Sequence, residues 1–278
     1  MYFSGIGDEA GKSLQHQIGA HRELGWKHIE LRNIDGVCVN DLCDSAFDRV
    51  VEQVTDAGLG VSAFASQLCN WGRPINVHPD IDVQELRRAL PRMKRLGCRY
   101  MRIMSYPNAG WPEEDWKQES LDRLRELAEI AEEGGITLAH ENCAGWGSQS
   151  PEAMLEMLEE VNSPALTVLW DTGNPVQQGV DAWDFYRQVK DHVGYVHIKD
   201  ARREEDGSVT YTYPCEGEGA VRKVLADLKD GGYTGAVSIE PHLESVVHEG
   251  DTGGTGERAY RAYVEYGKRL MNLVDSIE

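Results

Sequence analysis

The sequence predicts an α/β protein with a single (β/α)8 TIM barrel that spans residues 1–278. The first observation is a recurring pattern of amphipathic helix, glycine and short apolar strand, because alternating helices and strands indicate a parallel sheet. The second is length, since 278 residues divided among eight units give about 35 residues per unit, as in such barrels. The third is that no G-x-G-x-x-G motif follows the first strand, which disfavours an open dinucleotide-binding sheet. No linker or low-complexity tract marks a second domain.

The first four units fill the N-terminal half of the chain. Their strands are expected at 2–6, 27–32, 59–64 and 99–104, and their helices near 11–24, 44–57, 82–96 and 117–133. The fourth helix has the clearest pattern, because Leu121, Leu124 and Leu127 recur at helical spacing. Gly58 and Gly97 each follow a helix, where glycine supplies the left-handed conformation that ends it.

The last four units continue the same alternation. Their strands are expected at 136–142, 166–171, 195–200 and 236–241, and their helices from 150 onward, near 181–190, near 219–230 and at about 255–275. Ser150 followed by Pro151 is a typical helix start, with an N-cap side chain and a proline in the first helical position. Each of these strands ends in polar residues.

The composition describes an acidic protein whose 41% hydrophobic residues suffice for a large core. Lysine and arginine number 28 and aspartate and glutamate 47, so the net charge is 28 − 47 = −19. An acidic surface repels phosphate backbones and anionic lipids, so we expect no nucleic-acid and no membrane partner. The opening residues lack a basic region followed by an apolar stretch, which predicts a cytoplasmic protein. The six cysteines contain no C-x-x-C pair, which favours free thiols over a disulfide framework.

Charged or ionisable side chains close the last four predicted strands: Glu141, Asp171, His197 and Glu240. Because the carboxyl ends of neighbouring parallel strands lie on one face of a barrel, we expect these side chains to converge. Three carboxylates at low dielectric repel one another, and one divalent cation removes that conflict. Oxygen ligands with one imidazole and no thiolate suit Mn²⁺ first, with Mg²⁺, Co²⁺ or Zn²⁺ as alternatives. The competing interpretation is four independent groups that each cap a neighbouring helix.

Four short motifs around these residues carry a resemblance to a known family. They are His140-Glu141-Asn142, Asp171-Thr172-Gly173-Asn174, His197-Ile198-Lys199-Asp200 and Ile239-Glu240-Pro241-His242. Over essentially its whole length the chain resembles the xylose-isomerase-like barrel superfamily in its sugar (phosphate) isomerase/epimerase branch, which includes D-tagatose 3-epimerase, hydroxypyruvate isomerase and inosose dehydratase. The resemblance implies one divalent metal ion held by the four strand-end residues, with Glu141 and Glu240 as the proton-transfer pair.

The chain departs from the epimerase pattern at two positions. The epimerases usually carry a histidine three residues after the metal-binding aspartate, where this chain has Asn174, and a substrate-binding glutamate where it has Gly147. An arginine six residues after the metal-binding histidine is retained as Arg203. These differences argue against a ketohexose 3-epimerase and leave the expected metal site intact.

The expected site supports several reactions of a small sugar or polyol, free or phosphorylated. A cation on a carbonyl and its neighbouring hydroxyl stabilises the enediolate that forms when the shared carbon loses a proton. With Glu141 and Glu240 as catalytic acid and base groups, the leading prediction is a metal-dependent isomerase or epimerase. A lyase is the alternative on the same scaffold, by dehydration of a ketoinositol or elimination from a 3-keto-glycoside. A non-catalytic polyol-binding module is the alternative of another class.

Six further residues are predicted to contact substrate: Lys199, Arg203, Asn174, His242, Arg32 and Trp111. Lys199 could polarise a substrate oxygen, or it could pair with Glu141 or Asp171. Arg203 could hold a phosphate or a carboxylate, or lie solvated in its loop. His242 could reach the substrate or form a hydrogen bond at the strand end.

Arg32 stands two residues after Glu30 near the end of the second strand, so it could recognise a substrate hydroxyl or neutralise Glu30. Trp111 lies in a loop, where its ring could stack on a sugar face or pack in a lid or an oligomer contact. Barrels of this kind commonly associate, so a homodimer or homotetramer is compatible with the sequence.

Overall fold

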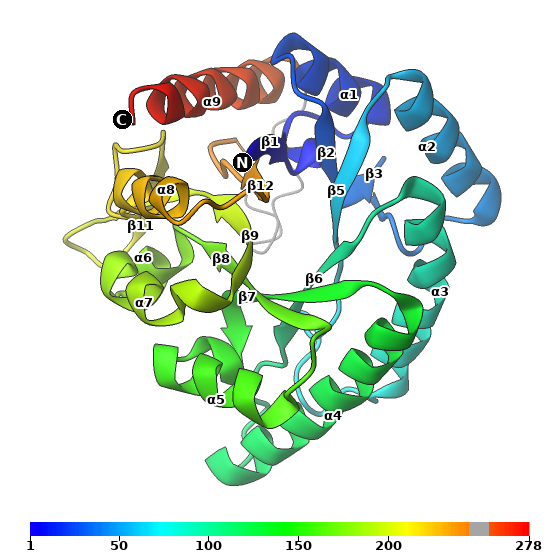
Figure 1. The fold of residues 1–278 in the computed structure, drawn as a ribbon, viewed down its shortest axis with the longest axis vertical. Helices are drawn as coiled ribbons and strands as arrows, with labels where there is room; N and C mark the ends of the chain where they lie inside the picture. Colours follow the sequence, from blue (N-terminus) through cyan, green and yellow to red (C-terminus); the bar gives the residue numbers. More distant parts are fainter. Residues whose placement is uncertain (245–255, 278) are drawn as a thin grey trace.

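The fold is a barrel of eight parallel strands surrounded by helices, as the sequence predicts (Figure 1). It is seen in a computed structural model that describes residues 1–244 and 256–277. The barrel strands are β1 (Tyr2–Gly5), β2 (His28–Leu31), β5 (Gly60–Ala65), β6 (Tyr100–Ser105), β7 (Thr137–Gly145), β8 (Leu166–Asp171), β9 (Val193–Ile198) and β12 (Ala236–Ile239). Their order is β1-β12-β9-β8-β7-β6-β5-β2, and a parallel bridge between Ile6 and Glu30 links the two edges.

Helices cover the outside of the barrel. Within the described residues they are α1 (Leu14–Glu23), α2 (Asp44–Asp56), α3 (Asp80–Leu96), α4 (Glu113–Gly134), α5 (Pro151–Val161), α6 (Asn174–Gln178), α7 (Ala182–Val189), α8 (Val221–Asp230) and α9 (Glu257–Asp275). Each predicted helix has its counterpart, although the predicted start of the last one, residue 255, lies outside the described residues. No helix in the described ranges is both long enough and apolar enough for a membrane span.

Three features differ from the predicted elements. The helix α6 was not predicted, because a five-residue helix is too short to show a hydrophobic period. Two small hairpins, β3 (Asn33–Ile34) with β4 (Val37–Cys38) and β10 (Asp200–Arg203) with β11 (Val209–Thr212), were not predicted either. The seventh barrel strand ends at Ile198, before the predicted end at residue 200, because the chain turns there into the second hairpin.

Local sequence accounts for several helix ends. The Ser150 hydroxyl accepts a hydrogen bond from the Ala153 N–H at 3.1 Å, and Pro151 opens α5, as expected for an N-cap followed by proline. Gly97 and Gly135 follow α3 and α4 with φ of 63° and 72°, in the left-handed region that glycine adopts without strain. These local signals explain why the helices could be placed without knowledge of the barrel.

The barrel interior contains a small hydrophobic cluster that is separate from the main core. It consists of Ala63, Ala139, Leu169, Tyr195 and Ala236. Because residues two apart on a strand share a face, positions 141, 171 and 197 face the same interior two residues further along their strands. The polar residues at the carboxyl ends of the strands therefore lie above a packed apolar floor.

Asp200 fastens the loop after β11 to the barrel. Its Oδ2 accepts hydrogen bonds from the N–H groups of Cys215 (2.8 Å) and Gly217 (3.1 Å). Its Oδ1 accepts from the N–H groups of Ala201 (2.9 Å) and Gly219 (2.9 Å). A Cβ at position 217 would lie 2.3 Å from the carbonyl oxygen of Ala201, so the tight approach of this loop requires glycine.

Replacing Asp200 by asparagine is expected to lower the free energy of unfolding by about 3 kcal/mol. Each hydrogen bond to a charged acceptor contributes about 1.5–3 kcal/mol, and the single amide oxygen of asparagine cannot accept from all four N–H groups. Urea denaturation measures this loss. The matched control is Asp206→Asn, an exposed aspartate in the same hairpin that bonds Ser208, with an expected change below about 0.5 kcal/mol. Equal losses in the two variants would contradict a special role for Asp200.

Candidate metal centre

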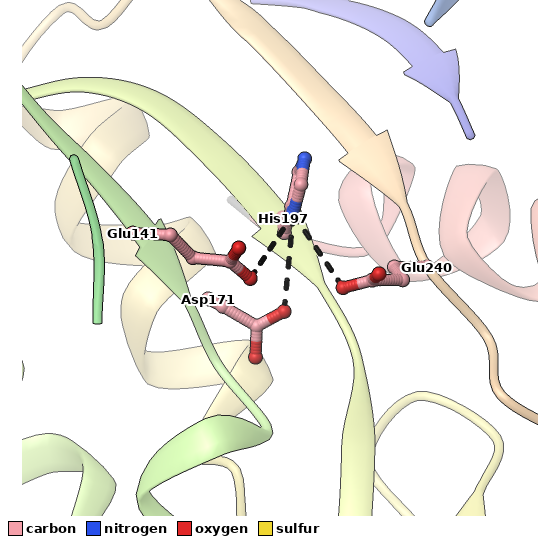
Figure 2. Close-up of side chains that lie close together, drawn as sticks. All are labelled: Glu141, Asp171, His197 and Glu240. Carbon is pink, nitrogen blue, oxygen red and sulfur yellow. Dashed lines mark ion pairs between the residues drawn. The ribbon is translucent and has the colours of Figure 1, made fainter. Parts of the chain in front are cut away.

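Four ionisable side chains meet at the carboxyl ends of four neighbouring barrel strands (Figure 2). Glu141 lies in β7, Asp171 ends β8, His197 lies in β9 and Glu240 follows β12. His197 Nδ1 lies 3.7 Å from a Glu141 oxygen, 4.0 Å from an Asp171 oxygen and 3.6 Å from a Glu240 oxygen. All four side chains are buried, and one candidate ligand atom of each lies within 4.8 Å of the others. The structure thus brings together the residues that the sequence singled out.

The donor atoms of this cluster fit a divalent cation. Among the described residues, Glu141 Oε2, Asp171 Oδ2 and His197 Nδ1 are buried and accept no well-aligned hydrogen bond. Buried polar atoms normally have hydrogen-bond partners, so these three atoms, of which Asp171 Oδ2 has an ion pair with Lys199, can each take a further ligand. Carboxylate oxygens with one imidazole are donors that Mn²⁺, Mg²⁺, Co²⁺ and Zn²⁺ all accept in proteins. The cluster could therefore hold one such ion.

Burial and neighbouring charges act in opposite directions on the carboxyl groups. Burial would raise the pKa of Glu141, but the positive charge of Arg102 and a contact with His197 outweigh it and hold the pKa at about 2. At Asp171 burial dominates and raises the pKa to about 6, although the ammonium of Lys199 partly offsets it. Because a metal ligand must be deprotonated, a cation would displace the proton that burial favours on Asp171.

Lys199 supplies a positive charge inside the cluster. Its Nζ lies 3.1 Å from Asp171 Oδ2 and 3.0 Å from Glu240 Oε2. Burial would lower the pKa of Lys199, but these two carboxylates raise it well above the usual value. Of the two pairings that the sequence suggested, the structure contains the one with Asp171; the other carboxylate partner is Glu240. A substrate contact of Lys199 stays a prediction.

Asn174 opens α6 immediately after β8 and contacts two of the four residues. Its backbone N–H donates a hydrogen bond to Asp171 Oδ1 at 2.8 Å, as does that of Gly173. Its side-chain amide donates to Glu141 Oε1 at 3.1 Å. The unpredicted helix therefore orients both carboxylates, and the predicted substrate contact of Asn174 is untested.

Arg32 does not neutralise Glu30, which was one of the two alternatives. Its guanidinium instead forms ion pairs with Asp8 (3.0 Å), Glu9 (3.3 Å) and Glu240 (3.0 Å). The reason is that Glu30 is already held by Tyr195, His197 and Ser238, whereas Arg32, two residues further along the chain, lies beside those three carboxylates. Arg32 thus contacts one member of the cluster and lines the cavity described below.

His242 is hydrogen-bonded at the end of its strand, as the second alternative had it. Its backbone N–H donates to Glu9 Oε2 at 2.8 Å, and its Nδ1 lies 2.9 Å from Glu9 Oε1. The side chain is buried, and its ring stands 5.0 Å from that of Tyr211 between centroids. These contacts explain its position without a substrate, and its predicted substrate contact is untested.

Arg203 and Trp111 lie apart from the cluster. The exposed Arg203 belongs to the β10–β11 hairpin, and its Nη1 donates to the Gln177 carbonyl at 3.2 Å. The half-buried Trp111 packs against the hydrophobic core, and its backbone N–H donates to Asn108 at 2.8 Å. In the part of the chain that the structure describes, neither contacts the four strand-end residues. Their substrate contacts stay predictions.

Arg102 is a residue of the site that sequence reasoning missed. It lies in β6, where its Nη1 stands 3.6 Å from Glu141 Oε2 and 3.9 Å from Glu240 Oε1. Nη2 donates to the Ser66 carbonyl at 3.2 Å, the guanidinium stacks 5.6 Å from the ring of Trp71, and Nε is buried without a partner among the described residues. The available signal was an arginine in the middle of an otherwise apolar strand, a position that is costly unless the charge is used.

A cavity of about 230 Å³ lies beside the cluster. Its lining includes Arg32, Arg102, Trp71, Asn33, Gln67 and Asn70. Two of these, Arg32 and Arg102, also contact carboxylates of the cluster, which places the cavity next to the candidate ligands. The volume is below the range of about 300–1,000 Å³ for drug-sized ligands, so the space suits a small polar molecule.

Comparisons with known proteins agree with this architecture. The profile of a family described as xylose isomerase-like TIM barrel matches residues 18–270. An inosose dehydratase of Geobacillus thermodenitrificans is 27% identical over 149 residues, which cover 49% of this chain and 50% of that protein. The chain therefore spans about half the length of that curated relative. A 2-epi-5-epi-valiolone 7-phosphate 2-epimerase of Actinoplanes sp. is 27% identical over 215 residues, which cover 77% of this chain and 73% of that protein.

Solved structures share the fold at lower sequence identity. An L-ribulose 3-epimerase has a TM-score of 0.76 at 18% identity, covering 99% of this chain and 95% of that one. The IOLI protein, solved with a zinc atom, has a TM-score of 0.78 at 19% identity, covering 100% and 99%. A barrel protein from Mycobacterium smegmatis, solved with magnesium, has a TM-score of 0.70 at 19% identity, covering 94% and 88%.

Proposed function

The chain belongs to the xylose isomerase-like TIM-barrel family, and from that premise we propose that it is a divalent-metal-dependent isomerase or epimerase of a small sugar or polyol, free or phosphorylated. One observation carries the proposal: four buried side chains from adjacent strands bring one candidate ligand atom each to a common point beside a small polar cavity, and three of them have a buried atom without a hydrogen bond among the described residues. When bound there, a divalent cation would supply the positive charge that stabilises negative charge on substrate oxygens.

We assign the proton transfer to two carboxylates. Glu141 and Glu240 lie on either side of His197 in Figure 2 and come from strands that two others separate. The pKa of each lies below its usual value despite burial, so both are ionised near neutral pH and can accept a proton. If one ionised carboxylate removes a proton from a carbon and the other, which has taken up a proton from solvent, delivers that proton to the opposite face, the result is epimerisation. Return to the neighbouring carbon gives isomerisation.

We assign to Arg102 the role of holding a substrate oxygen during this transfer. Its guanidinium reaches both Glu141 and Glu240, and its Nε has no hydrogen-bond partner within the described ranges. A guanidinium in a water-poor site stabilises negative charge that develops on an oxygen more strongly than it would in bulk water. Arg102 would therefore act on the same reaction as the two glutamates, through the substrate oxygen.

A lyase is the second candidate, and the sequence likeness to inosose dehydratases favours it. The same residues serve it, because one ionised carboxylate can remove a proton while the other, after taking up a proton from solvent, protonates a hydroxyl that leaves from the next carbon as water. This chain has Asn174 and Gly147 where the epimerases usually carry a histidine and a glutamate, and these two residues are compatible with a lyase reaction.

The first test is metal content, measured by elemental mass spectrometry after purification without chelator and loading with Mn²⁺. We expect about one ion per wild-type chain, held by the four strand-end residues, and loss of that ion in Asp171→Ala. Protein with bound metal is then incubated with ketoses, aldoses and ketoinositols in D₂O. An isomerase or epimerase gives a product with the formula of the substrate in which deuterium has replaced a hydrogen. A dehydratase gives a product that has lost water. Wild-type protein without an ion contradicts the proposal, and ion binding without turnover favours the polyol-binding module.

A further inference from the structure

Glu30 is a buried carboxylate directly behind the candidate metal centre. It lies in β2 and is fully buried. His197 Nε2 lies 3.0 and 3.1 Å from its two oxygens. Its Oε2 also accepts hydrogen bonds from the hydroxyls of Tyr195 at 2.8 Å and Ser238 at 2.6 Å. Among the described residues, no lysine or arginine forms an ion pair with Glu30, so its one partner that can carry positive charge is His197.

Further hydroxyl groups hold Glu30 in one orientation. The Tyr195 hydroxyl, which contacts Glu30, also lies 2.9 Å from Ser62 Oγ, and Ser62 Oγ lies 2.7 Å from Ser4 Oγ. A buried carboxylate costs several kcal/mol unless hydrogen bonds satisfy its oxygens, and here every oxygen has a donor. The network therefore keeps an ionised group at a position where an apolar residue would cost less. That arrangement points to a use for the charge.

The charge of Glu30 selects one form of the His197 ring. An ionised carboxylate accepts hydrogen bonds and donates none, so the ring nitrogen that faces it must carry the proton. This assigns a proton to Nε2 and leaves Nδ1 facing the cluster, 3.6–4.0 Å from three carboxylate oxygens. A histidine binds a metal ion through its unprotonated nitrogen. With the proton of Nε2 directed at Glu30, Nδ1 is the ring nitrogen left to bind a metal ion.

We infer that Glu30 is a positioning residue, which holds His197 in the orientation and tautomer that present Nδ1 to a divalent cation and thereby sets the metal affinity of the centre. The inference rests on the proposed metal-dependent function. Glu30 does not line the cavity, so it acts through His197 and not on the substrate. Carboxylate partners of metal-binding histidines typically contribute about 10–100-fold in metal affinity.

The deciding variant is Glu30→Gln, which keeps the size of the side chain. Its amide can donate to Nε2, which allows the proton of His197 to move to Nδ1 and compete with the metal. The Mn²⁺ dissociation constant, from paramagnetic resonance of the free ion, is expected to rise about 10–100-fold. The melting temperature of the metal-free protein is expected to fall as well, because the substitution breaks a buried pair. A purely structural residue would lower the melting temperature and leave the dissociation constant of the folded protein unchanged.

Two further measurements complete the test. Ser4→Ala removes a hydroxyl of the same network that does not touch Glu30, and its Mn²⁺ affinity is expected to match the wild type. Nitrogen-15 NMR of histidine-labelled wild-type protein with Zn²⁺ bound is expected to show the proton of His197 on Nε2. A wild-type dissociation constant in Glu30→Gln, or a His197 protonated on Nδ1, would overturn the inference. Wild-type protein that binds no ion would instead contradict the metal-dependent function itself.

Discussion

Turnover is expected to fall by about 10²–10⁴-fold when either Glu141 or Glu240 is replaced by glutamine, the range that a positioned acid or base contributes. Both residues are also candidate metal ligands, so rates are compared at saturating Mn²⁺ with metal content measured in parallel. If each carboxylate serves one face of the substrate, each variant should block proton removal from a different epimer. Glu141→Gln should block deuterium uptake from one epimer in D₂O, and Glu240→Gln should block it from the other.

The matched control for this experiment is Glu216→Gln. Glu216 is an exposed acid in the glycine-rich loop, where it forms an ion pair with Arg269 at 2.6 Å. No role in proton transfer is proposed for it. Its turnover is expected to equal that of the wild type. Wild-type rates in both cluster variants would exclude them as acid and base groups. Equal loss of uptake from both epimers would indicate that the two carboxylates act together on one face, as in a lyase.

The second large effect is expected at Arg102. Replacement by methionine should lower kcat by about 10²–10³-fold, as removal of one donor to a developing oxyanion does, while metal content stays at the wild-type level. Arg102→Lys keeps the charge and loses the planar fork, so it should recover only part of the rate. Steady-state kinetics and elemental analysis of the same preparations measure both quantities.

Arg99→Met is the control for this substitution, because Arg99 is exposed and precedes β6 by one residue. It is expected to leave kcat and KM unchanged. If Arg102→Met lost its metal together with its activity, the guanidinium would be a structural counter-ion of the carboxylates and not a contact of the substrate. If it kept both, Arg102 would have no part in the reaction.

The sequence by itself predicted the barrel and the candidate ligands. Each barrel unit has local signals, such as the glycine after α3 at Gly97 and the cap at Ser150, and these do not depend on the rest of the molecule. The four strand-end residues could be predicted for the same reason, because a polar residue at the end of an apolar strand is recognised from the few residues that precede it. The rule that parallel strands share one carboxyl face then placed them together.

Only the tertiary structure decided which side chains meet around them. Arg32 pairs with Glu240 across 208 residues, and Glu30 pairs with His197 across 167. Arg102 reaches Glu141 from the neighbouring strand β6, and it reaches Glu240, which follows β12, from three strands further away. The alternation of residues along a strand predicts which face each side chain is on. It does not predict which side chain lies opposite across the barrel, because that depends on the stagger between strands and on the closure of the barrel. The candidate ligands could therefore be read from local pattern, whereas the charges that surround them required the closed barrel.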